Sequence, residues 1–131
     1  MKRARKALAL VFAAAAVLAF LPTTAFARWA LFQSITPSLS FSSNKAQADV
    51  VVRAQPGADS VSATIYLCEE QPGGIYYQVY KWPEQKRAGN YLSFTGSCPA
   101  TPGKTYRLYI EATAKKGSQS EFVSVYTQRA Y

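Results

Sequence analysis

The chain has 131 residues, with fifteen Lys and Arg against seven Asp and Glu, so its formal net charge is +8. It has no histidine, which excludes Ser-His-Asp and Cys-His catalytic arrangements and most transition-metal sites. The basic residues are scattered rather than clustered, so we expect no nucleic-acid partner.

Residues 1–27 have the composition of a signal peptide: a basic start, an apolar run over residues 7–21, and small residues at Ala25 and Ala27. We expect the run to be a signal helix rather than a membrane-spanning helix, because it is shorter than the ~20 residues that spanning a membrane needs. Cleavage after Ala27 would leave residues 28–131 as one secreted, extracellular domain with no stable membrane anchor. The signal peptide holds four of the fifteen basic residues and no acid, so this domain would carry a charge of +4.

The rest of the chain shows the period-two alternation of β-strands and no sustained helical periodicity. Turn signals such as Gln71-Pro72-Gly73-Gly74 separate the alternating segments. We therefore expect about seven strands, at residues 35–41, 46–52, 61–67, 75–82, 91–95, 106–112 and 121–127, with a polar loop over residues 83–90. Short strands between Pro and Gly turns predict an all-β, two-sheet antiparallel sandwich.

The segment Thr101-Pro102-Gly103-Lys104-Thr105-Tyr106 resembles the late Pro-Gly-x-x-Tyr segment of fibronectin type III domains. The resemblance implies an immunoglobulin-like sandwich whose third, fourth, sixth and seventh strands share one sheet. It also implies a structural corner at Tyr106, whose hydroxyl bonds to upstream backbone while its ring fills the core. The chain departs from that family because its second strand lacks a buried Trp and it carries two cysteines. In architecture it is similar to small secreted sandwiches of Gram-positive bacteria.

The two cysteines, Cys68 and Cys98, lie in a chain with an export signal, where a disulfide is the expected state. The third and fifth strands run in the same direction, so their ends lie at the same pole of the sandwich. A redox or metal pair is the alternative, but the chain has neither a CxxC spacing nor a histidine. We therefore expect a structural disulfide.

Aromatic residues are the feature that points to a ligand. If Ile75, Tyr77 and Val79 face the core, the alternation turns their neighbours outward onto one face of the sheet, with Arg107 as a polar anchor. A cross-strand ladder that stiffens the sheet is one interpretation, and a binding platform for a protein or a cell-surface glycan is the other. The expected face consists of Tyr66, Tyr76, Tyr80, Trp82, Arg107 and Tyr109.

The last strand is ambiguous, because either Val123 and Val125 or Phe122 and Tyr126 could face the core. The acids offer no convincing pair for catalysis; Glu111 and Glu121 could face each other across the final hairpin, but two solvated residues are the simpler interpretation. We expect a non-catalytic binding module without metal or cofactor. The alternatives are a small extracellular effector or inhibitor acting by protein contact, for example through residues 83–90, and a structural surface component.

Overall fold

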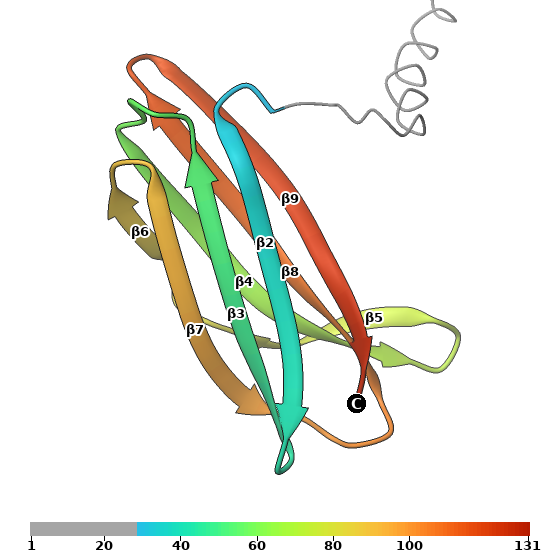
Figure 1. Ribbon diagram of the computed structural model, residues 1–131. Coiled ribbons are helices and arrows are strands. Elements are labelled where there is room, and N and C mark those ends of the chain that lie inside the picture. Colours follow the sequence, from blue (N-terminus) through green and yellow to red (C-terminus); the bar gives the residue numbers. More distant parts are fainter. Residues whose placement is uncertain (1–28) are drawn as a thin grey trace, which may run out of the picture.

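The computed structural model describes residues 29–131, which form two antiparallel β-sheets packed face to face (Figure 1). The smaller sheet has the order β2-β3-β7 and consists of β2 (Phe32–Ser42), β3 (Lys45–Ala54) and β7 (Tyr91–Pro99). The larger sheet has the order β5-β4-β8-β9, with a further strand, β6, paired to β4; its strands are β4 (Ser60–Gln71), β5 (Ile75–Lys81), β6 (Gln85–Ala88), β8 (Thr105–Lys116) and β9 (Gln119–Ala130).

The predicted all-β, two-sheet sandwich is therefore confirmed. The predicted division of strands is also confirmed, because the third, fourth, sixth and seventh expected strands are β4, β5, β8 and β9 of the larger sheet. The predicted signal helix lies outside the described residues. A membrane-crossing helix is absent from residues 29–131.

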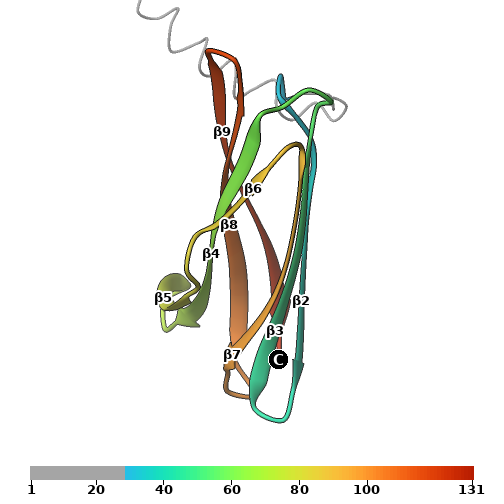
Figure 2. The ribbon, with the colours of Figure 1, turned by 90° about the vertical axis from the view of Figure 1, so that its left-hand side faces the viewer.

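The core lies between the two layers that Figure 2 shows edge-on, and it is built from alternate positions of the strands. β3 follows the expected alternation along its length, β4 follows it as far as Leu67 and β8 as far as Ala114, with every second side chain buried. The ambiguity in the last strand is resolved, because Val123 is buried and Val125 packs against the core. Phe122 and Tyr126 face outward and are 63% and 50% exposed.

Residues 83–90 are not entirely a loop. The short strand β6 occupies residues 85–88 and pairs with the first half of β4, from Ser60 to Ala63. β5 pairs with the second half of β4, so the two short strands share one edge of that long strand.

The edge strands β2 and β9 close one side of the sandwich. At the start of β9, the Glu121 carboxylate accepts hydrogen bonds from the N–H groups of Ala30, Leu31 and Phe32, at 3.0, 2.6 and 3.2 Å. Near the end of β9, the Arg129 guanidinium donates to the Leu39 carbonyl of β2 at 3.1 Å. We call this contact the β2/β9 seam. In it, side chains of β9 form hydrogen bonds with main-chain groups near both ends of β2.

Candidate functional site

A β-bulge in the β4–β5 hairpin decides which way the side chains of β5 point. Leu67 of β4 pairs with Tyr80, but the next residue, Cys68, pairs with Gln78, so Val79 is the extra residue. An extra residue reverses the alternation beyond it. Tyr80 therefore shares the inner face with Leu67, and its predicted outward orientation is wrong.

Trp82 also follows the bulge, and its predicted outward orientation is wrong for the same reason. It is only 6% exposed and belongs to the core. Its main-chain N–H donates to the Ile65 carbonyl at 3.0 Å. The indole lies against Gly96 of β7 and contacts Phe94 edge-on, with ring centroids 5.8 Å apart. The Tyr80 ring also packs edge-on against Trp82, with ring centroids 5.0 Å apart.

β5 is the free edge strand of the larger sheet, and Figure 2 shows it curling away from the smaller sheet. Ile75, Tyr77 and Val79 were expected in the core, but no opposing strand covers them. Four of the seven large exposed hydrophobic side chains in residues 29–131 belong to this strand, and Tyr77 is 58% exposed. Apolar side chains concentrated in this way are typical of an interaction surface. We call Ile75, Tyr77, Val79 and Tyr80 the β5 surface.

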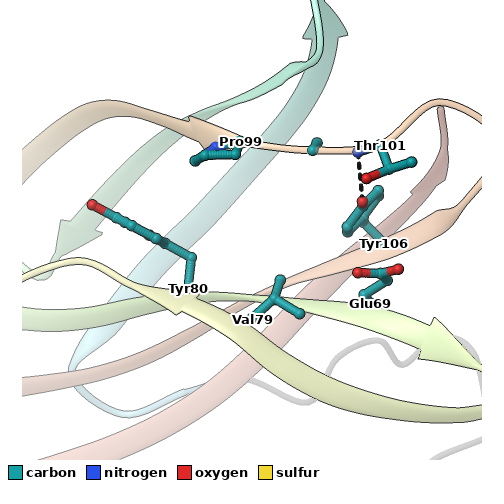
Figure 3. Close-up of a pocket in the computed structure, with 7 residues that line it drawn as sticks. Glu69, Val79, Tyr80, Pro99, Thr101 and Tyr106 are labelled. Atoms are coloured by element: carbon teal, nitrogen blue, oxygen red, sulfur yellow. Dashed lines mark hydrogen bonds between the residues drawn. The ribbon is translucent and has the colours of Figure 1, made fainter.

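A pocket with a volume of about 330 Å³ opens beside the β5 surface (Figure 3). Val79 and Tyr80 form one side, and the segment of residues 99–101 at the end of β7 forms the other. Glu69 supplies a carboxylate, which is paired with Lys104 at 3.2 Å. The lining residues are Glu69, Val79, Tyr80, Pro99, Ala100, Thr101 and Tyr106.

Tyr106 fixes the geometry of this pocket. Its ring is 1% exposed, and its hydroxyl accepts a hydrogen bond from the Thr101 N–H, five residues upstream, at 2.8 Å. This bond holds the connection between β7 and β8 against the end of the core. The sequence indicated this corner but not the pocket beside it, because the pocket depends on the bulge at Val79.

The outer face of the larger sheet carries three tyrosines in one cross-strand row. Tyr66 of β4 pairs with Tyr109 of β8, and Tyr109 pairs with Tyr126 of β9. The ring centroids are 5.9 and 5.1 Å apart. The Tyr66 hydroxyl donates a short hydrogen bond to the Glu111 carboxylate. Burial, together with this bond, raises the pKa of Tyr66 to about 12.

Arg107 lies next to this row, and its guanidinium packs over two aromatic rings. The centre of its guanidinium is 4.0 Å from the Tyr76 ring centroid and 4.4 Å from that of Tyr126. Its Nε donates to Gln128 Oε1 at 2.9 Å, and its Nη1 donates to the Tyr109 hydroxyl at 3.0 Å. The bond to Tyr109 raises the pKa of Arg107 above its ordinary value. These contacts hold the side chain in one orientation.

The structure thus brings together four of the six expected face residues, Tyr66, Tyr76, Arg107 and Tyr109, and separates Tyr80 and Trp82 from them. It adds Tyr126, which sequence reasoning missed because the phase of the last strand was open. We call Tyr66, Tyr76, Arg107, Tyr109 and Tyr126 the Arg107 cluster.

The expected disulfide is not formed, because Cys68 and Cys98 are both free and buried. Cys98 pairs with Ala46 and faces the core, whereas Cys68 pairs with Arg107 on the outer face. Cys98 of the smaller sheet therefore points into the space between the two sheets, whereas Cys68 of the larger sheet points away from it. Burial raises the pKa of Cys98 to about 11 and also raises that of Cys68, where the charge of Arg107 partly opposes the shift.

Two acids considered at the sequence level lie apart. Glu111 bonds to Tyr66 on the outer face, whereas Glu121 accepts a hydrogen bond from Phe32 of β2 at the seam. Within residues 29–131 there is no group of three or more His, Cys, Asp or Glu that could hold a metal ion. Non-catalytic function stays a prediction.

No protein-family model matches the chain, and no curated protein does. Among solved structures, the chain is similar to the ApaA protein of Bordetella pertussis, with 13% sequence identity and a TM-score of 0.48. The match covers 79% of this chain and 97% of that one.

Proposed function

We propose that this protein is a secreted, non-catalytic interaction module that binds an extended segment of a partner protein along β5. The observation that carries the proposal is the β5 surface, where exposed apolar side chains lie on a free sheet edge. Secretion rests on the signal-peptide pattern of residues 1–27. An extracellular effector or inhibitor that acts by protein contact is the form of this function that the surface favours.

The free edge explains why the partner segment is an extended one. β5 pairs with β4 on one side, and none of the described strands pairs with its other side. An unpaired edge leaves main-chain N–H and C=O groups that another strand can bind, a mode in which main-chain bonds supply affinity. Natural proteins often protect such edges with charge, but Lys81 is the single charged residue of β5.

The pocket explains how such a segment is selected. Alternate side chains of an added strand point to the inner side, where Val79 and Tyr80 border the pocket. Its lining combines apolar side chains with one carboxylate that Lys104 already neutralises. We infer that the pocket accepts an apolar side chain, so the partner segment carries apolar residues at alternate positions.

We also infer that the sandwich is of the immunoglobulin-like, fibronectin type III kind. The support is the strand order β2-β3-β7 and β5-β4-β8-β9, together with the bond from Thr101 to Tyr106. The outer edge of β5 is available to partners because the short strand β6, and not β5, packs against β7 of the smaller sheet.

The test is selection of phage-displayed random peptides on the secreted domain, followed by binding measurements on two variants. Val79→Lys places a charge at the mouth of the pocket, at a half-exposed position where the fold tolerates it. Phe122→Lys is the matched control, because Phe122 is exposed on β9, the opposite edge of the same sheet. We expect selected peptides with alternating apolar residues that bind wild type and Phe122→Lys but not Val79→Lys.

Hydrogen exchange of the complex then separates strand addition from simple side-chain contact. Bound peptide should slow exchange of the main-chain amides within residues 75–81. Peptides that bind Val79→Lys as well as wild type, or that leave exchange in β5 unchanged, would contradict the proposal.

A further inference from the structure

Arg107 has a positive charge, and none of the acids in residues 29–131 forms an ion pair with it. The ion pair in residues 29–131 joins Glu69 and Lys104, not Arg107. The two groups that accept hydrogen bonds from Arg107, Gln128 and Tyr109, are both uncharged. The Glu111 carboxylate of the same strand is engaged by the Tyr66 hydroxyl.

The guanidinium retains unused donors. It has five N–H groups, of which one on Nε and one on Nη1 have acceptors, so three have none among the described residues. These three lie on Nη1 and Nη2, the pair that grips a carboxylate with two parallel bonds. The rings of Tyr76 and Tyr126 already hold the guanidinium in place, so a ligand would order few additional groups on binding.

The surroundings of Arg107 fit a ring-shaped ligand. Tyr126 remains half exposed beside the guanidinium, and Phe122, four residues earlier on β9, presents a second exposed ring on the same face. Lys81 pairs with Tyr66 at the other end of the tyrosine row and adds a second positive charge. Charge and aromatic surface therefore lie next to each other on the outer face.

We propose that the Arg107 cluster binds a carboxylate-bearing sugar, such as a uronic acid unit of an extracellular polysaccharide. The carboxylate accepts hydrogen bonds from Nη1 and Nη2 of Arg107, and the sugar ring packs against Tyr126. This site is separate from the β5 surface, because it lies on the opposite face of the larger sheet.

The test is titration calorimetry with a short galacturonic acid oligomer, the neutral galactose oligomer of the same length, and a sulfated galactose oligomer. We expect the uronic acid oligomer to bind at least about tenfold more tightly than the neutral one, because hydrogen bonds to charged groups are worth that much in affinity. Arg107→Gln should lose this difference, and Arg107→Lys, which keeps the charge but not the fork, should lose part of it.

Arg53→Gln is the matched control, because Arg53 also lies over a tyrosine ring, that of Tyr91, at 4.9 Å on the other sheet. It should leave binding unchanged, as should Val79→Lys, which separates this proposal from the binding of peptides to β5. Equal weakening by Arg53→Gln and Arg107→Gln would overturn the site in favour of general charge attraction. Equal affinity for the neutral oligomer, or binding of the sulfated oligomer alone, would overturn the carboxylate assignment.

Thermal melts show whether Arg107→Gln keeps the fold. If it unfolds, the comparison of Arg107→Lys with Arg53→Lys decides. A loss of uronic acid binding in the first variant alone supports the site, and equal binding by both contradicts it.

Discussion

Replacement of Glu121 by Ala tests whether the β2/β9 seam stabilises the fold. The substitution removes the acceptor of three main-chain hydrogen bonds at the start of β2. The bonds from Leu31 and Phe32 are partly buried and the bond from Ala30 is exposed, so we assign about 1 kcal/mol to each of the first two and little to the third. The expected loss in the free energy of unfolding is therefore about 2 kcal/mol.

For a domain of this size, a loss of about 2 kcal/mol lowers the melting temperature by about 8–16 °C. Urea unfolding followed by tryptophan fluorescence measures the free energy, and a thermal melt gives the temperature. Glu121→Gln keeps one carbonyl oxygen as an acceptor, so its stability should lie between those of Glu121→Ala and wild type.

Glu84→Ala is the control, since Glu84 is exposed and has no partner among the described residues; it should change stability by less than about 0.5 kcal/mol. If Glu121→Ala unfolds at the same urea concentration as Glu84→Ala, the seam does not stabilise the domain and the reasoning is refuted.

Three further predictions concern the core. Tyr106→Phe should lower the free energy of unfolding by about 1–2 kcal/mol in urea titrations, because the Thr101 N–H loses its acceptor; an unchanged midpoint would contradict this. Gly96→Ala should cost about 1–3 kcal/mol and shift tryptophan emission, because the added Cβ would lie 2.7 Å from Trp82 Nε1; a variant with wild-type emission and stability would refute the packing described. Burial raises the pKa of Cys98 to about 11, above the 9.0 of an exposed thiol. Between pH 9 and 11 the folded state therefore holds a proton that the unfolded state has lost, so the free energy of unfolding should fall as the pH rises through this range. In Cys98→Ala this fall should shrink in urea titrations, and at pH 8 iodoacetamide should label wild-type Cys98 only after unfolding.

The sequence predicted the central strands well because their alternation is uninterrupted. In β3, β4 and β8, the apolar positions recur at every second residue, and each strand pairs with a neighbouring strand on both of its edges. Period-two patterning reports directly on burial under those conditions.

β5 shows why the same reasoning fails elsewhere. Its pattern is as regular as that of β8, but the bulge at Val79 reverses the side chains that follow, and the register of a bulge depends on the partner strand. Burial of Ile75 and Tyr77 further requires an opposing sheet, which the pattern of one strand does not report. The disulfide prediction failed for a different reason, because it relied on strand direction, which does not tell which side a residue takes. The alternation that buries Leu67 also turns Cys68 outward, so the sequence did contain a signal against the bridge.

The β2/β9 seam has a mechanical consequence. Residues 29 and 131 lie at opposite poles, with Ala30 bonded to Glu121 at one pole and the Tyr131 hydroxyl accepting from the Asn44 N–H at the other. A pull on these two ends runs along β2 and β9 and loads the bonds of Glu121 and Arg129 in shear, so several must break together. The β4–β5 hairpin lies outside this line of force, so a partner held at β5 would stay attached while the domain bears tension.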